Sequence, residues 1–213
     1  MKGSIECLYQ ERNLGGKHII RGEKVMKIAF IVYDDMTALD FIGVYDPIAR
    51  LKSMGFYEDL SIDICAYQPK VKDYYGYLNM LPQKIGGSLK EYDIVVLPGG
   101  FGSRNLINNE KFINWIKDIS KNALKVSVCT GALILGAAGF LDNRAATTHP
   151  NAFEELKPFC KEVKRDRIVE DGNIITARGV TAGIDLGLYL CEKLTDIQTK
   201  ESIRIQMDYK TSN

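Results

Sequence analysis

Residues 125–136 have the sequence KVSVCTGALILG, in which Cys129 joins a short apolar run to a helical pattern. Small residues flank the cysteine at Ser127 and Gly131, as in a nucleophile elbow whose usual Ser is replaced by Cys. Small neighbours are needed because a strand that turns abruptly into a helix brings its own backbone atoms close together. The stretch therefore predicts a strand–turn–helix unit with a strained central residue. The side chain of that residue projects from the carboxyl end of the strand, where α/β sheets bind ligands.

Cys129 has two interpretations. As a nucleophile, its thiol would lie at the positive end of a helix, which favours the thiolate. As a core residue, it would be one of the buried and unreactive cysteines that are common in protein interiors. The pattern alone does not choose between them.

Apolar runs alternate with helical patterns on both sides of this unit. Runs rich in Ile and Val predict strands at 27–33, 60–67, 92–100 and 124–129. Apolar residues at helical spacing predict helices at 41–54, 108–122 and 130–141. This alternation is typical of an α/β fold, a doubly wound and mainly parallel sheet with helices on both faces.

Several shorter elements complete the chain. Residues 74–83 predict a short ribbon, and residues 167–177 predict a hairpin centred on Asp171-Gly172. Two closing helices are expected at 181–194 and 196–209, the first capped by Thr181.

We divide the chain into three parts. Residues 27–207 are expected to form one domain, and residues 208–213 a short tail. Residues 1–26 are polar and show no clear periodicity, so they are interpreted as an N-terminal extension. The extension is either a non-native or flexible addition that precedes a natural start at Met26, or a genuine segment that packs on the domain surface. N-terminal sequencing of the native protein distinguishes these.

Composition limits the partners. The 213 residues carry 28 basic and 27 acidic side chains, a net charge of +1, which gives no reason to expect a nucleic-acid or membrane partner. A small-molecule substrate is expected instead. The five cysteines are scattered without a Cys-x-x-Cys pair, which predicts free thiols in the reducing cytoplasm. With only two histidines, no metal site is expected.

Other candidate site residues follow the predicted strands. Gly99 and Gly100 come after the 92–100 strand and would let backbone N–H groups approach an anion or oxyanion. Asp40 lies between apolar neighbours, so it is either a helix cap or a carboxyl group with a raised pKa. His149 is a possible base, although a histidine before Pro at an element boundary is more often structural. Asp185 is expected to bond backbone groups.

These stretches occur together in the order found in the ThiJ/PfpI superfamily, which the chain resembles over about residues 27–207. The matching segments are Leu39–Gly43, Leu97–Gly100, Ser127–Ala132, Leu135–Gly139, Ala146–His149 and Arg178–Asp185. Within the superfamily, the sequence is most similar to the isonitrile hydratases. The resemblance implies a flavodoxin-like fold, usually dimeric, with cysteine chemistry that uses no cofactor.

The resemblance also implies roles for particular residues. Cys129 matches the nucleophile of the hydratases, and Asp40 and Thr130 match the two residues required beside it. Gly99, Gly100, Gly131 and His149 would line the substrate or stabilise the intermediate. An isonitrile would then become an N-substituted formamide through a covalent thioimidate.

Departures from the pattern keep alternatives open. The PfpI-type peptidases have His directly after the nucleophile, where this chain has Thr130, so proteolysis is disfavoured. The glyoxalase and deglycase branch has Glu at the place of Asp40 but shares the histidine before Pro150, which makes chemistry on small 2-oxoaldehydes the main alternative. Val44 after Gly43 departs from the hydratase pattern and leaves the specificity open.

A third interpretation is a non-enzymatic sensor. A reactive, accessible Cys129 would be prone to oxidation. The few residues after the last predicted helix lead us to expect no fused DNA-binding module, although a sensing domain by itself fits the sequence.

Overall fold

The computed structural model describes residues 9–14, 17–22 and 24–210. Cys7, parts of the predicted extension and the end of the predicted tail lie outside these ranges. A seven-stranded sheet forms the centre of the domain, with strand order β12-β13-β9-β8-β3-β4-β7. Its strands are β3 (Met26–Ile31), β4 (Leu60–Ala66), β7 (Lys84–Ile85), β8 (Ile94–Leu97), β9 (Leu124–Val128), β12 (Ile168–Asp171) and β13 (Ile174–Ala177).

The predicted fold class is confirmed. Every neighbouring pair in the sheet is parallel except the hairpin of β12 and β13. The chain adds β4 and β7 on one side of β3, and it adds β8, β9 and β13 on the other. The strand order therefore reverses beside β3, and the carboxyl ends of β3 and β8 flank the crevice where open α/β sheets bind ligands. This is a flavodoxin-like arrangement.

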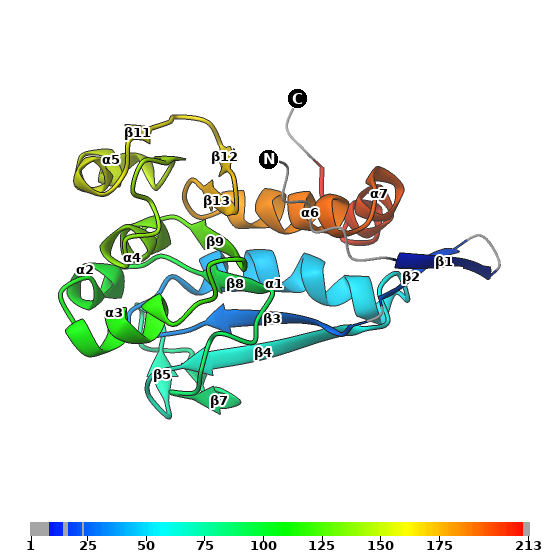
Figure 1. Cartoon of the computed structure of the whole chain (residues 1–213), viewed down its shortest axis with the longest axis horizontal. Coiled ribbons are helices and arrows are strands. Elements are labelled where there is room, and N and C mark those ends of the chain that lie inside the picture. The colour runs from blue at the N-terminus through cyan, green and yellow to red at the C-terminus, as the bar shows by residue number, and fades with distance from the viewer. Residues whose placement is uncertain (1–8, 15–16, 23, 211–213) are drawn as a thin grey trace.

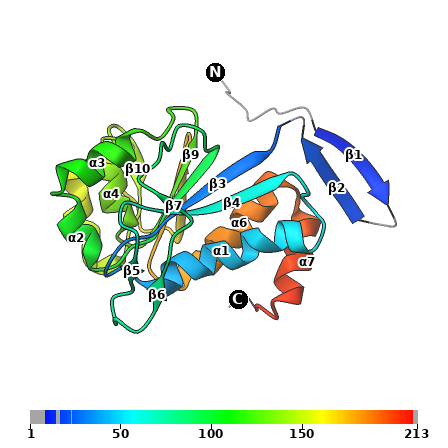
Figure 2. The same cartoon turned by 90° about the horizontal axis from the view of Figure 1, so that it is seen from below.

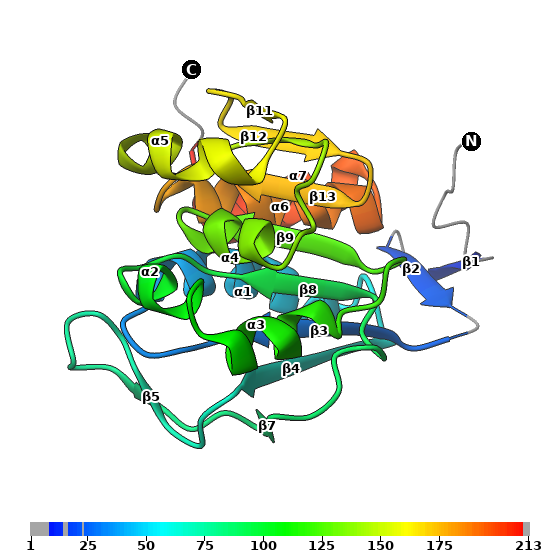
Figure 3. The same cartoon turned by 60° about the vertical axis from the view of Figure 1, so that its left-hand side comes forward.

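Helices cover both faces of the sheet (Figures 1 and 3). One layer contains α1 (Ala38–Ser53), α6 (Ala182–Leu194) and α7 (Ile197–Gln206). The other contains α2 (Gly102–Leu106), α3 (Glu110–Lys117), α4 (Gly131–Ala137) and α5 (Phe153–Leu156), with short 3-10 turns at Pro150–Ala152 and Lys157–Phe159. All residues of β8, β9 and β13 are buried, as expected for strands covered on both faces.

The two closing helices differ in how they are capped. Thr181 occupies the N-cap position of α6, but its side chain makes no capping hydrogen bond, so that prediction is wrong. Its hydroxyl instead accepts a bond from Arg167 Nη2 at 3.3 Å. Helix α7 is capped by Asp196, whose carboxylate accepts from Thr199 N at 2.7 Å.

The smaller elements agree broadly with the patterns. In the predicted hairpin of β12 and β13, Asp171 faces Ile174 across the turn, so the two loop residues are Gly172 and Asn173, one position later than expected. Of the ribbon expected at 74–83, only β6 (Asn79–Met80) lies in that range, because its partner β5 (Val71–Lys72) precedes it. A short parallel pair joins β10 (Ala145–Ala146) to β11 (Glu162–Val163).

The N-terminal region contains a hairpin that the sequence did not predict. Strand β1 (Tyr9–Leu14) pairs antiparallel with β2 (Lys17–Gly22), from Tyr9 opposite Gly22 to Leu14 opposite Lys17. This hairpin is a separate two-stranded sheet. Figure 2 shows it beyond the amino end of β3, outside the central sheet.

Candidate active site

The turn between β9 and α4 has the strained geometry that the sequence predicts. Cys129 has a φ of 56°, in the left-handed region that residues other than Gly rarely adopt. Its N–H donates to Ala177 O at 3.0 Å and Arg178 O at 3.1 Å, and its carbonyl accepts from the Thr148 hydroxyl at 2.8 Å. Backbone strain persists only where surrounding contacts fix it, and these bonds provide such contacts.

Close backbone packing explains the small residues around Cys129. A Cβ atom on Gly131 would lie 2.3 Å from Leu97 O and 2.7 Å from Pro98 O. A Cβ atom on Gly99 would lie 2.5 Å from Thr130 N and 2.7 Å from Cys129 Cβ. The loop after β8 and the elbow after β9 therefore touch through their backbones, which only Gly allows.

We predict that Gly131→Ala destabilises the protein by about 3 kcal/mol, because the atoms that the new methyl group meets are backbone carbonyls that cannot rotate away. Gly87→Ala is the matched control, since a Cβ atom there meets nothing within 4 Å. Urea unfolding of both variants measures the difference. Equal stabilities would show that the elbow relaxes around the methyl group.

Asp40 lies in the first turn of α1 and is fully buried. Thr37 holds the N-cap position, and Asp40 bonds no amide of its own helix, so the capping interpretation of Asp40 is wrong. Its Oδ2 accepts instead from Gly99 N at 3.0 Å, across from another loop. Its Oδ1 has no hydrogen-bond partner among the described residues. The carboxyl group is close enough to the Cys129 thiol for the two groups to influence each other's ionisation.

The carboxyl group and the thiol titrate as a coupled pair. Burial raises the pKa of Asp40 to about 7, against the lowering effect of the Gly99 N–H and of Cys129. Burial, followed by the negative charge of Asp40, raises the pKa of Cys129 to about 12, although the Thr130 N–H favours the thiolate. The expectation of a low thiol pKa from the helix terminus is therefore wrong. Above about pH 7, and until the thiol ionises near pH 12, the pair carries one proton and one negative charge.

Thr130 connects the elbow to the glycine loop. Its hydroxyl accepts from Gly100 N at 2.9 Å and donates to Gly100 O at 3.0 Å. The Gly100 N–H is therefore already occupied, and so is the Gly99 N–H, which bonds Asp40. Both glycine amides that were expected to approach an oxyanion are therefore engaged within the protein, and the amide that faces the sulfur is that of Thr130.

His149 and Asp185 have partners of their own. His149 Nδ1 accepts from Asn151 N at 3.2 Å, and its ring packs so closely on Gly179 that a Cβ atom there would lie 2.1 Å from it. Among the described residues, no hydrogen bond joins this ring to Asp40 or Cys129. Asp185 accepts from Arg167 Nε at 2.6 Å and from the Tyr209 hydroxyl at 2.8 Å, so its partners are side chains and not the expected backbone groups.

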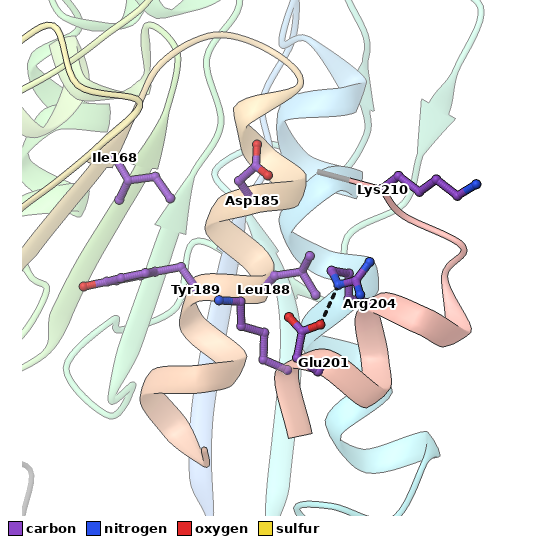
Figure 4. Close-up of a pocket in the computed structure, with 8 residues that line it drawn as sticks. Ile168, Asp185, Leu188, Tyr189, Glu201, Arg204 and Lys210 are labelled. Atoms are coloured by element: carbon purple, nitrogen blue, oxygen red, sulfur yellow. Dashed lines mark hydrogen bonds and ion pairs between the residues drawn. The ribbon is translucent and has the colours of Figure 1, made fainter. Parts of the chain in front are cut away.

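A large cavity lies away from the Asp40–Cys129 pair. It has a volume of about 610 Å³ between β12, α6 and α7 (Figure 4). Its lining residues are Ile168, Asp185, Leu188, Tyr189, Lys200, Glu201, Arg204 and Lys210. Arg204 pairs with Glu201 at 2.8 Å, and Lys200 pairs with Glu192 at 2.7 Å. Four of the five charged side chains that line the cavity are paired within the protein, so we do not assign the cavity as a binding site.

The described residues form neither a metal site nor a membrane-spanning helix. Within residues 9–14, 17–22 and 24–210, no group of three or more His, Cys, Asp or Glu side chains could hold a metal ion. None of the helices in the described part of the chain is long and apolar enough to cross a membrane.

Comparison with known proteins identifies the family. The model of the DJ-1/PfpI family matches residues 26–193, which is most of the chain. The chain belongs to the DJ-1/PfpI family. Isonitrile hydratase of Pseudomonas putida is 32% identical over 186 residues, covering 86% of this chain and 78% of that protein. Protein DJ-1alpha of Drosophila melanogaster is 30% identical over 115 residues, about half of each chain.

Solved structures of DJ-1/PfpI proteins share the fold. A ThiJ/PfpI family protein from Pseudomonas syringae has a TM-score of 0.79 and 29% identity, covering 88% of this chain and 76% of that one. DJ-1beta of Drosophila melanogaster has a TM-score of 0.75 at 19% identity, covering 87% of this chain and 99% of that one, which shows the common fold alone. The resemblance inferred from the motifs is thus confirmed at the level of the family.

The residues that the sequence singled out differ in how the fold uses them. Six of them come together at the carboxyl ends of β3, β8 and β9: Asp40, Gly99, Gly100, Cys129, Thr130 and Gly131. Sequence reasoning missed Thr148, whose hydroxyl fixes the elbow carbonyl, and Tyr33, whose hydroxyl donates to Pro98 O at 2.7 Å. Each bond joins residues that are far apart in the chain, so no local pattern could have indicated it.

Proposed function

We propose that this protein hydrates an isonitrile to an N-substituted formamide by covalent cysteine catalysis without a cofactor, acting as a hydro-lyase. The observation that carries the proposal is the buried carboxyl group of Asp40 beside the thiol of Cys129, at the point where the strand order reverses. The similarity to the Pseudomonas putida isonitrile hydratase over most of both chains supports it.

The first step uses the shared proton of the pair. With the proton on Asp40 and the charge on sulfur, the thiolate attacks the terminal carbon of the isonitrile and forms an S–C bond. Asp40 donates its proton to that carbon, which gives a thioimidate and leaves Asp40 ionised. The pair thus supplies a nucleophile and an acid from a single proton.

The second step returns the enzyme to its starting state. Ionised Asp40 takes a proton from water while the hydroxide adds to the thioimidate carbon, and the same proton passes to the substrate nitrogen. The hydroxyl proton of the adduct then moves to Asp40, the C=O bond forms and the C–S bond breaks. The products are the formamide, the thiolate and a protonated Asp40, so all atoms balance.

The neighbouring groups would hold this arrangement. The Thr130 N–H, which faces the sulfur, would stabilise negative charge as the thiolate leaves. The Thr130 hydroxyl would act by fixing Gly100, the contact that it makes in the structure. His149 would line the substrate beside Gly179, on which its ring packs. Gly99 would orient Asp40, and Gly131 would allow the approach of the β8 loop.

A paired assay tests the proposed function. Formamide formation from p-nitrophenyl isonitrile and consumption of methylglyoxal are measured on one purified sample, each beside a Cys129→Ala control. Cysteine-dependent formamide formation with little loss of methylglyoxal supports the hydratase. The reverse pattern would assign the protein to 2-oxoaldehyde chemistry, the alternative that His149 keeps open. Inactivity on both, with ready oxidation of Cys129 by peroxide, would favour a sensor.

We also propose that the protein is a cytoplasmic homodimer. The four described cysteines are all free, which fits a reducing compartment. The segment around β5 and β6 presents large apolar side chains to solvent, with Tyr75 70%, Tyr77 91% and Leu81 79% exposed. Beside them Tyr74 stacks on Phe101 at 4.5 Å. Several large exposed apolar side chains on one segment are typical of a protein–protein interface.

We expect Tyr77→Glu to convert the dimer to a monomer, because a carboxylate would have to be buried in an apolar interface. Light scattering coupled to size-exclusion chromatography measures the mass. Ile205→Glu is the matched control, since Ile205 is 67% exposed on α7, away from this segment. A dimer that survives Tyr77→Glu would exclude the β5–β6 segment as the interface.

A further inference from the structure

A single peptide unit connects a buried tyrosine to the candidate acid. The carbonyl of Pro98 accepts a hydrogen bond from the Tyr33 hydroxyl at 2.7 Å. The N–H of the same peptide unit, that of Gly99, donates to Asp40 Oδ2 at 3.0 Å. Tyr33 lies just beyond β3, Pro98 and Gly99 just beyond β8, and Asp40 in the first turn of α1. Three segments that meet at the crevice are therefore joined by two consecutive bonds.

We propose that Tyr33 is a positioning residue that controls the proton of the Asp40–Cys129 pair through the Pro98–Gly99 peptide. A hydrogen bond to a peptide oxygen polarises the unit and strengthens its N–H as a donor. A stronger N–H donor favours the ionised carboxylate that accepts it. The hydroxyl of Tyr33 thereby favours the singly charged state of the pair, although it bonds neither Asp40 nor Cys129. For the hydration reaction, this inference rests on the proposed function.

The surroundings make Tyr33 a permanent donor. Its side chain is buried, and its ring meets Phe112 edge-on at 6.2 Å. Burial, with the negative charges that Asp40 and Cys129 can carry, raises the pKa of Tyr33 well above its ordinary value. The hydroxyl consequently stays protonated while Asp40 titrates near pH 7. The bond from this hydroxyl also holds the Pro98–Gly99 peptide in one orientation, because the tyrosine ring is itself packed in the core.

The other elements around Asp40 bring few competing charges. Cys129 faces it from the elbow and Tyr33 from the end of β3. Helix α6 packs on this end of α1 through Gly183, which lies against the Asp40 carbonyl. The nearby acidic group of α6, Asp185, is paired with Arg167. Arg104, on α2, is near enough to influence Tyr33 but pairs with Glu155.

The rate of Cys129 alkylation by iodoacetamide, followed against pH on the full chain, tests the proposal without any isonitrile. Peptide mass spectrometry separates Cys129 from the other cysteines. The rate should first rise as the pair becomes singly charged near pH 7. We expect the midpoint of this first rise to lie about half a pH unit higher in Tyr33→Phe than in the unmodified protein. Tyr92→Phe is the matched control, because it also removes a buried tyrosine hydroxyl, one that donates to Asp63 at 2.9 Å. Its midpoint should not move.

A second variant keeps the test decisive if Tyr33→Phe does not fold. Tyr33→3-fluorotyrosine preserves the side chain but makes its hydroxyl a stronger donor, so the midpoint should move to lower pH. A higher midpoint in Tyr33→Phe and a lower one in the 3-fluorotyrosine variant support the proposal. If Tyr33→Phe does not fold, the lower midpoint of the 3-fluorotyrosine variant supports it alone. Unchanged midpoints, or equal shifts in Tyr92→Phe, would overturn it. Because alkylation needs only the pair, these outcomes stay informative if the paired assay shows no hydration.

Discussion

Replacing Cys129 with alanine is expected to lower kcat for isonitrile hydration by a factor on the order of 10⁵ or more, since removal of a covalent nucleophile commonly abolishes activity on this scale. The two other buried thiols already have partners of their own. Cys65 is buried and bonds Tyr92, and Cys191 is buried and bonds Pro47 O. The measurement is formamide formation under saturating isonitrile, with the mass of the covalent intermediate recorded for the unmodified enzyme.

The fold should survive this change, because the bonds that hold the elbow are made by the Cys129 backbone. Circular dichroism and thermal unfolding check that point. Cys65→Ala is the matched control: it removes another buried thiol at the end of a strand in the same sheet and should retain activity. Activity that persists in Cys129→Ala, or is lost equally in both variants, would contradict covalent catalysis by Cys129.

The elbow was predictable because its constraint is local. Two close backbone segments demand small residues, and Ser127, Gly131 and Gly99 supply them within or directly after predicted strands. The parallel sheet was predictable for a similar reason, since buried strands such as β8 and β9 form continuous apolar runs. Both features can be predicted from sequence because they depend on the size and polarity of each residue itself.

The electrostatics of the site could not be predicted, because they depend on partners distant in the chain. The bond between Gly99 and Asp40 spans 59 residues, and the bond between Tyr33 and Pro98 spans 65. A helix terminus next to Cys129 suggested a low thiol pKa, yet burial and the Asp40 charge raise it. Desolvation is a property of the packed interior and leaves no mark on the residues beside the cysteine.

The wrong capping predictions have the same origin. Asp40 and Thr181 are good N-cap types at helix starts, but tertiary partners take both side chains: Gly99 bonds Asp40, and Arg167 bonds Thr181. The β1–β2 hairpin was missed because its strands lack an alternating apolar face. For the same reason, no local pattern predicts the pairing of residues 9–14 with residues 17–22.

Replacing Asp40 with asparagine is expected to lower kcat for isonitrile hydration by about 10² to 10⁴, because the amide can accept the Gly99 N–H but can neither give nor take a proton. In the unmodified enzyme the active pair is the singly charged one, so hydration should increase as pH rises through about 7, the pKa of Asp40. That inflection should vanish in the variant. Asp46→Asn, on the exposed side of the same helix where Asp46 pairs with Arg50, should keep both rate and profile.

The same substitution should stabilise the protein at alkaline pH. The pKa of Asp40 is about 7 in the folded state and near its ordinary value, about 3.9, in the unfolded chain. Between these values the folded state binds more protons, so the free energy of unfolding decreases as pH rises, and the loss is complete above pH 7. Asparagine cannot ionise and avoids this loss. Asp40→Asn should therefore be more stable by about 2–4 kcal/mol at pH 8 but little changed near pH 4.

Urea unfolding at the two pH values measures this difference. A gain in stability together with a loss of activity would mean that the buried carboxyl group is maintained for its chemistry, against its cost to the fold. If Asp40→Asn is destabilised equally at both pH values, Asp40 acts mainly by supporting the Gly99 loop. The activity loss would then follow from a displaced peptide, and catalysis by the Asp40 proton would be excluded.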